Sequence, residues 1–514
     1  MADVITHYDA IEGYCEQLSY TAGETVGLCV STGAPSFDVT VSRWGAAREI
    51  VWSANGLAGT AQPTPVTADS TGCSWEATVQ IPVDDNWQSG FYLVELVAAD
   101  APPARRLGHA CFVVRSSTPR RRALFVLATN TWNAYNDWGG RSLYTGGHQV
   151  SFQRPFGRGM LTRPETERDD RKARPRWRGE QPDVDGEIYQ RYRYEHGYPG
   201  YMGSAGWFTY DRRFVEWAER AGLEFDYAVS SDLERLEGLT DGYQLVIGAG
   251  HDEYWSGLQR DAVERFVAAG GNYASFSGNT MFWQVRLTDD GGAMVCHKYS
   301  AHLDDPVIAD DPSAMTGMWC DPAVGRPESR FLGASSMYGL YSRFGQATPR
   351  GIGGFVVYRD DHWMLAGTGL HYGDVVGDDD GVVGYETVGT RFTFDHVNLP
   401  VIVTDPLLPD PSDVELVAVT PASNLAMGEY PASIAALDDQ GDIEFIAERA
   451  FGGGPDAMAL ARHGNAVMLT CHPYGRQAGQ VVTIGSTDWV FGLTDPMVGR
   501  VTRNVVERLT GHSR

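Results

Sequence analysis

The first 115 residues alternate apolar and polar side chains in short runs separated by turn-forming residues. Alternation with a period of two is typical of strands that bury one face, and several short strands at this spacing favour a β-sandwich. We therefore expect an antiparallel β-sandwich of immunoglobulin-like shape over residues 1–117. The runs that carry this prediction are 25–32 (TVGLCVST), 37–45 (FDVTVSRWG), 49–54 (EIVWSA), 74–82 (SWEATVQIP), 90–98 (GFYLVELVA) and 109–116 (HACFVVRS).

The pattern changes after residues 116–122 (SSTPRRR), which we interpret as a linker because they are small, polar and basic around a proline. Residues 123–130 (ALFVLATN) are apolar without alternation, as expected of a strand covered on both faces. Strand-like segments then alternate with amphipathic helices, which predicts βαβ units and a parallel sheet. Residues 118–514 are thus expected to form an α/β domain with a doubly wound, mostly parallel sheet. Its expected elements include strands at 243–250, 272–278, 362–367 (HWMLAG), 383–389 (VGYETVG) and 464–472, and helices at 211–221, 256–271 and 498–511.

Charge and cysteine content exclude several classes of protein. The chain has 66 acidic and 41 basic residues, a formal net charge of −25, which repels nucleic acid and anionic lipid, so neither is an expected partner. The 7 cysteines are odd in number and form no CxxC pair, which argues against a disulfide framework and a zinc ribbon. The N-terminus lacks the basic and apolar regions of a signal peptide, which predicts a cytoplasmic protein.

Polar side chains follow three of the expected strands at the point where each strand ends. In an open parallel sheet the ligand crevice lies outside the carboxyl ends of the strands, because successive loops converge there. Polar groups flanked by aromatic rings are typical of a small-molecule pocket. The segments are 131–144 (TWNAYNDWGGRSLY), 251–255 (HDEYW) and 279–283 (NTMFW).

Each of these side chains also has an ordinary structural interpretation. His251 or Glu253 could cap the following helix, although Ser256 is the better cap because it directly precedes that helix. Asn279 follows a glycine and could be only a turn residue. The tyrosines of 131–144 could be amphipathic fillers.

No familiar catalytic motif explains the cluster. The strand ends carry neither a GxSxG elbow nor a cysteine, no GxGxxG follows the first α/β strand, and HDE is not the HExxH zinc motif. What remains is a carboxylate, phenols and an imidazole. Oxygen ligands of this kind suit a hard metal ion, and a trivalent ion can bind tyrosine as phenolate.

Several blocks of the sequence resemble the large (beta) subunit of N,N-dimethylformamidase and its relatives. The resemblance spans most of residues 120–514. It implies an α/β catalytic domain with a mononuclear ferric iron held by two tyrosines and one glutamate. The blocks are ATNTWNAYNDWGGRSLY, GHDEYWS, SFSGNTMFW, VGYETVG, and GSTDWVFGL together with TRNVVERL.

The resemblance assigns metal ligands motif by motif. Glu253 of GHDEYW is the expected carboxylate ligand, and Tyr135 of WNAYN is the first expected phenolate. We expect Tyr144 of RSLY to be the second phenolate. Other candidates for that second position are Tyr189, Tyr192 and Tyr194.

The implied chemistry is hydrolysis of the C–N bond of a small amide. The iron would act as a Lewis acid on the carbonyl and activate water near neutral pH. His251 and Asn279 would orient the substrate or stabilise the developing oxyanion, and Glu386 would move a proton from water to the leaving amine. The expected aromatic walls are Trp132, Trp138, Trp255 and Phe282.

Partners and competing functions follow from the same residues. We expect a small amide as substrate and a homo-oligomer, while the need for a separate small subunit stays open, since dimethylformamidase works with one. The sandwich carries no catalytic cluster and is expected to serve packing or assembly. Two alternatives remain: a non-catalytic protein that binds a sugar or another polar ligand in the crevice, and a hydrolase of another bond that uses zinc or another divalent ion with His251 and Glu253.

Overall fold

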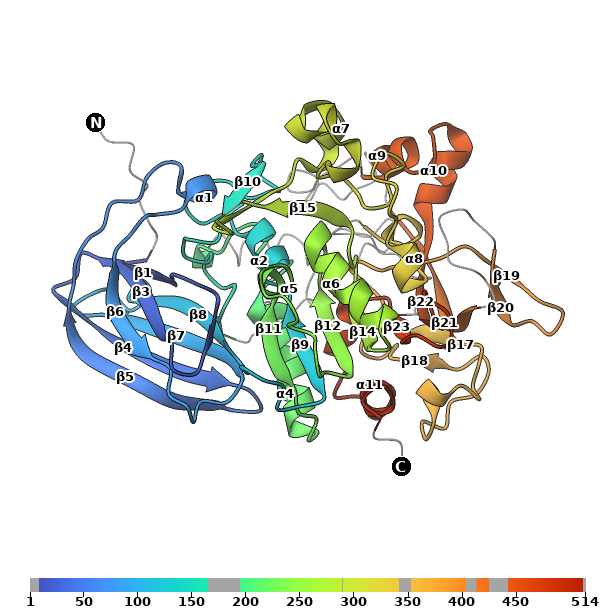
Figure 1. Cartoon of the computed structure of the whole chain (residues 1–514), viewed down its shortest axis with the longest axis horizontal. Helices are drawn as coiled ribbons and strands as arrows, with labels where there is room; N and C mark the ends of the chain where they lie inside the picture. Colours follow the sequence, from blue (N-terminus) through green and yellow to red (C-terminus); the bar gives the residue numbers. More distant parts are fainter. Residues whose placement is uncertain are drawn as a thin grey trace. The chain divides into compact units, whose positions relative to one another are not determined.

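The chain is known from a computed structural model, which describes residues 9–164, 195–288, 290–341, 353–403, 413–424 and 442–511 (Figure 1). These residues fall into two compact units. The first unit contains the described residues 9–164, 195–239, 286–288 and 290–297. The second contains 240–285, 298–341, 353–403, 413–424 and 442–511.

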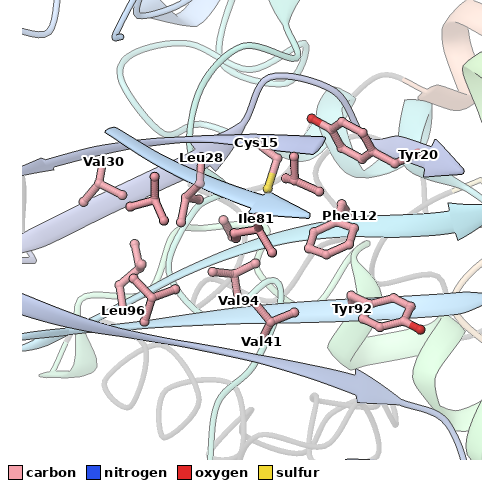
Figure 2. Close-up of a cluster of buried hydrophobic side chains, with 14 of the residues drawn as sticks. Cys15, Tyr20, Leu28, Val30, Val41, Ile81, Tyr92, Val94, Leu96 and Phe112 are labelled. Atoms are coloured by element: carbon pink, nitrogen blue, oxygen red, sulfur yellow. The ribbon is translucent and has the colours of Figure 1, made fainter. Parts of the chain in front are cut away.

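Two facing sheets make up the N-terminal part of the first unit. One has the strand order β1-β3-β6 and the other β2-β8-β7-β4-β5; the pair β2–β8 is parallel and the other pairs are antiparallel. Apolar side chains of both sheets meet between them, as Figure 2 shows for Leu28, Ile81, Val94 and Phe112. All six predicted runs fall on strands, which are β1 (Ile11–Cys15), β2 (Ser19–Thr21), β3 (Thr25–Thr32), β4 (Ser36–Trp44), β5 (Arg48–Ala58), β6 (Ala77–Pro82), β7 (Gly90–Ala98) and β8 (Leu107–Arg115).

The first unit continues beyond the predicted linker. The strand expected at 123–130 is β9, which pairs in parallel with β11. The linker itself is fastened by the buried carboxylate of Asp226, which accepts hydrogen bonds from Ser116 Oγ at 2.7 Å and from the N–H groups of Arg120 and Arg121 at 2.7 and 3.1 Å. The elements of this part are β9 (Ala123–Leu127), α2 (Thr129–Tyr135), β10 (Gln149–Ser151), η2 (Trp207–Asp211), α4 (Arg212–Arg220), β11 (Asp226–Val229), α5 (Ser230–Arg235) and β16 (Ala293–Val295). The short helix α1 (Ala68–Thr71) belongs to the N-terminal part, between β5 and β6.

The second unit is organised around a sheet with the order β12-β14-β23-β22-β21-β17-β18, visible as neighbouring strands in Figure 1. Pairing is parallel from β12 to β23 and antiparallel from β23 to β18. Helices α6 and α11 both contact β14. These elements are β12 (Leu245–His251), α6 (Gly257–Ala268), β14 (Asn272–Gly278), β17 (Phe355–Val357), β18 (Val375–Val376), β21 (Val414–Ser423), β22 (His463–Cys471), β23 (Val481–Ile484) and α11 (Pro496–Leu509).

Two of the strand predictions for this unit are wrong. Residues 362–367 form a short 3-10 turn, η7 (Trp363–Leu365), in which His362 Nδ1 accepts a hydrogen bond from the Met364 N–H at 3.3 Å. Residues 383–389 make isolated bridges through Thr387 and Gly389 instead of a continuous strand, because Tyr385 adopts a left-handed φ of 51° that interrupts an extended backbone.

Shorter elements complete the described part of the chain. They are β13 (Tyr254–Ser256), β15 (Trp283–Leu287), η3 (Lys298–Ser300), α7 (Ala301–Asp304), η4 (Pro306–Ala309), η5 (Pro312–Ala314), α8 (Ser329–Leu332), η6 (Ser336–Tyr338), β19 (Phe392–Phe394), β20 (Pro400–Ile402), α9 (Asp442–Arg449), α10 (Pro455–Arg462) and η9 (Thr487–Phe491). Among the described helices, none combines the length and apolar character that a membrane crossing requires. The immunoglobulin-like class, the doubly wound class, the boundary at residue 117 and the cytoplasmic location stay predictions.

Candidate active site

Two of the predicted site residues, Tyr135 and Tyr144, form a stacked pair in the first unit. Tyr135 is the last residue of α2 and only 2% exposed. The two rings stack at a centroid distance of 4.1 Å, and Tyr144 OH donates a hydrogen bond to Tyr135 OH at 2.6 Å. Tyr201, which the sequence did not single out, adds a third ring 5.1 Å from Tyr144. The pair therefore presents two phenol oxygens side by side.

A second group of predicted residues, His251, Glu253 and Glu386, meets in the interior of the second unit. His251 Nε2 lies 2.6 Å from Glu386 Oε2 and 3.3 Å from Glu253 Oε2. All three side chains are buried, with exposed fractions of 0, 2 and 6% for the side chains of His251, Glu253 and Glu386. Their ligand atoms lie within 4.8 Å of one another, close enough to hold one metal ion.

Electrostatics decide the protonation of this cluster. Burial by itself would lower the pKa of His251, but the charge of Glu386 and hydrogen bonds to Glu253 and Glu386 raise it to about 10. The imidazole is thus protonated at neutral pH in the protein alone, and its positive charge balances part of the buried negative charge.

The local sequence explains why these residues meet. His251 ends β12, and its partner in the parallel register is Gly278 at the end of β14. A Cβ on Gly278 would lie 2.0 Å from the carbonyl oxygen of Glu386, so only glycine lets the Glu386 backbone approach this closely. Tyr385 precedes Glu386 with its φ of 51°, and such a conformation in a bulky residue is typical of functional sites.

Asn279 directly follows Gly278 and supplies an unused acceptor. It is 1% exposed and has a left-handed φ of 52°, which asparagine tolerates better than most residues. Its Oδ1 has no hydrogen-bond partner among the described residues. A buried amide oxygen without a partner costs free energy, which suggests that a ligand group completes this position.

The predicted helix cap is confirmed, which frees the preceding residues for other roles. Ser256 Oγ accepts a hydrogen bond from the Gln259 N–H at 3.1 Å at the start of α6. Neither His251 nor Glu253 is therefore needed to cap this helix.

The expected aromatic walls are all buried, and two of their indoles bond to carboxylates. Trp132 Nε1 donates to Asp211 Oδ2 and Trp255 Nε1 to Asp252 Oδ1, each at 3.0 Å. Trp138 is 9% and Phe282 4% exposed. The competing ligands Tyr189, Tyr192 and Tyr194 lie outside the described residues.

Two buried charged residues of the second unit received no role from the sequence, namely Asp252 and Lys298. Burial raises the pKa of Asp252, between His251 and Glu253, to about 7, although its bond from Trp255 and the charge of His251 lower it. Lys298, one of two lysines in the chain, is 4% exposed with a φ of 52°, and its Nζ lies 5.3 Å from the Trp283 ring centroid and 5.1 Å from that of Tyr299. The only feature of the sequence that sets Lys298 apart is the scarcity of lysine in this chain.

Comparison with known proteins gives a family match. The family described as N,N-dimethylformamidase beta subunit-like, C-terminal, matches residues 37–503. Two N,N-dimethylformamidase beta subunits, from Alcaligenes sp and Paracoccus aminophilus, are each 31% identical over 78 residues. Those alignments cover 15% of this chain and 10% of each relative. The family match begins inside the sandwich, well before residue 120, where the motif resemblance starts.

Proposed function

Because the chain belongs to the N,N-dimethylformamidase beta subunit-like family, we propose that it hydrolyses the C–N bond of a small amide. The observation that carries this proposal is the buried group of His251, Glu253 and Glu386, whose ligand atoms lie within 4.8 Å of one another. A buried imidazole between two carboxylates is poised to bind a polar reactant and to hold or transfer a proton.

We further propose a ferric ion bound by Tyr135, Tyr144 and Glu253. Two observations fit such an ion. The phenol oxygens of Tyr135 and Tyr144 are 2.6 Å apart, near the separation of about 2.8 Å for neighbouring ligands with metal–oxygen bonds of about 2 Å. Glu253 offers a buried carboxylate oxygen, and all three ligands are the hard donors that a ferric ion prefers. The tyrosines and Glu253 belong to different units, so their meeting around one ion stays a prediction.

The bound ion would polarise the amide carbonyl and lower the pKa of a water molecule. The surrounding side chains then have separate tasks. His251 would donate a hydrogen bond toward the negative charge that develops on the carbonyl oxygen, while Glu386, whose Oε2 lies 2.6 Å from His251 Nε2, keeps the imidazole oriented. Asn279 Oδ1 would accept a hydrogen bond from the substrate or from water. Glu386 would carry the proton from water to the leaving amine.

A second function is favoured by one specific feature of the structure. His251, Glu253 and Glu386 by themselves form a three-residue ligand set with the N and O donors that zinc and similar divalent ions bind. In that case His251 would be a neutral metal ligand, the two tyrosines would not bind metal, and the enzyme could hydrolyse another bond.

The reaction class is tested by amine release from a panel of small formamides and acetamides with purified full-length protein. We expect release by the wild type and loss of release in Glu253→Gln, with far-UV circular dichroism showing the fold intact. Hydrolysis of none of the amides by folded, iron-loaded protein would contradict the proposal. The homo-oligomer and the need for a small subunit stay predictions, which the mass of the active species would test.

A further inference from the structure

The loop that carries Tyr144 rests on the N-terminal sandwich. This loop, residues 136–147, begins directly after Tyr135 and contains Trp138. The Trp138 indole meets Trp75 edge to face at a centroid distance of 5.8 Å, and Trp75 packs in turn against Tyr14 of β1 at 5.7 Å. Trp138 is thereby part of a buried cluster whose other members all come from the sandwich, namely Tyr14, Cys29, Ala68, Cys73 and Trp75.

Hydrogen bonds fasten the same region to the sandwich. Asp69 of α1 accepts a hydrogen bond at Oδ2 from the Arg141 N–H at 2.7 Å. A Cβ on Gly140 would lie 2.5 Å from that oxygen, so this glycine lets the loop approach α1. Just after the loop, Gln149 Nε2 donates to the Ser70 carbonyl at 2.8 Å, and α1 contacts β10 (Figure 1).

The loop is also tied back to α2, so its position affects the tyrosine pair. The Leu143 N–H donates to the Ala134 carbonyl at 3.0 Å, and these two residues each neighbour one of the tyrosines. The buried Arg154 donates to the carbonyls of Asn136 at 2.8 Å and Trp138 at 2.6 Å. These bonds hold both ends of the stretch from Trp138 to Leu143, the residue before Tyr144, against α2 and Arg154.

We propose that the sandwich is a positioning element of the active site: Trp75 and Asp69 hold loop 136–147 so that the phenol of Tyr144 stays against that of Tyr135. This rests on the proposed function for the role of the two phenols as ligands. The start of the family match at residue 37 supports it, because the family then includes part of the sandwich. It adds a role to the expected one in packing or assembly, which stays a prediction.

Two matched pairs of variants separate positioning from general stability. Trp75→Leu is compared with Trp87→Leu, since both indoles are buried in the sandwich, 6 and 7% exposed, but Trp87 stacks on Tyr92 within the sandwich core. Asp69→Ala is compared with Asp38→Ala, whose carboxylate likewise accepts a backbone N–H, from Gly56 in the β4–β5 hairpin. The aspartate pair keeps the proposal testable if Trp75→Leu does not fold.

The first readout is amide hydrogen exchange of the peptide that contains Leu143 and Tyr144, because neither amide bonds to a substituted residue. We expect exchange there to accelerate about tenfold in Trp75→Leu and Asp69→Ala. The controls should leave this peptide unchanged. The second readout is the phenolate-to-iron absorption band, which should weaken or shift in the same two variants, with a fall in kcat at nearly constant KM.

The outcomes distinguish the two proposals. If the exchange and the band are the same in the test and control variants while Glu253→Gln loses its iron, the positioning role is wrong and the proposed function stands. If the wild type shows no phenolate-to-iron band, the proposed ferric site with its two tyrosine ligands fails. Accelerated exchange in the test variants would then still show that the sandwich holds the loop in place. The positioning of metal ligands, however, would be overturned.

Discussion

His251 Nε2 lies 2.6 Å from Glu386 Oε2, which joins the end of β12 to a segment far along the chain, between β18 and β19. Both side chains are buried, so their charges are poorly screened and each strongly affects the other. The first prediction follows from this pair.

Glu386→Gln should abolish most activity and also destabilise the protein, because it leaves the protonated His251 with only one carboxylate. We expect at least a 100-fold fall in kcat and a loss of about 2–3 kcal/mol in the free energy of unfolding. Amine release and urea unfolding measure the two effects. Glu415→Gln is the matched control, since Glu415 lies 3.5 Å from His362 but is half exposed, and it should change stability by less than about 1 kcal/mol. Full activity in Glu386→Gln would remove this residue from the mechanism.

Asn279 allows backbone conformation and side-chain chemistry to be separated. Asn279→Gly keeps the left-handed φ accessible and removes the amide, so we expect thermal stability near that of the wild type and a large loss of activity. Asn279→Ala should lose activity and in addition about 1 kcal/mol of stability, because alanine is strained at this φ. An active Asn279→Gly variant would show that the residue is only a turn former.

Gly278→Ala should be among the most damaging single-methyl additions in the second unit. The new Cβ would lie 2.0 Å from the Glu386 carbonyl oxygen and 2.6 Å from the Thr487 nitrogen, so the backbone that carries Glu386 must move. We expect a loss of about 3 kcal/mol or more and inactive protein. Gly257→Ala, where a Cβ meets nothing within 4 Å, should be neutral or slightly stabilising. Equal Tm values for the two variants would argue against the close approach.

Glu12 of β1 should make stability depend on pH. Burial and the neighbouring charge of Asp9 raise its pKa to about 8, against an opposing hydrogen bond from Trp138 and the charge of Arg158. Between the ordinary glutamate pKa of 4.5 and a pH of about 8, the folded protein retains a proton that the unfolded chain releases, so the free energy of unfolding falls as pH rises through this range. Glu12→Gln should flatten this dependence. The test is the Tm of both proteins from about pH 5 to 8; parallel curves would contradict the raised pKa.

Local patterns in the sequence predicted much of the fold that surrounds the site. Apolar runs located β9 and β12, the alternation of strands with helices located β14, and the position of Ser256 predicted the start of α6. These elements depend on neighbours in sequence, so periodicity and capping chemistry are sufficient to find them.

The remaining features of the site depend on contacts between residues far apart in the chain, which local sequence patterns do not predict. VGYETVG has the composition of a strand, but the left-handed Tyr385 makes it a loop that delivers Glu386 to His251. The hydrogen-bonded stacking of Tyr144 on Tyr135 depends on the fold of the loop between them. The family resemblance, and not spacing, selected Tyr135, Tyr144 and Glu386 as site residues.

The most direct test of the central claim is the visible absorption spectrum and metal content of the purified full-length protein, measured for the wild type, Glu253→Gln, Tyr135→Phe and Tyr144→Phe. We predict stoichiometric iron with a phenolate-to-iron band in the wild type, loss of iron in Glu253→Gln with the fold retained, and a weakened or shifted band in each tyrosine variant. A colourless, folded wild type that contains zinc, and that keeps this zinc in both tyrosine variants, would contradict it.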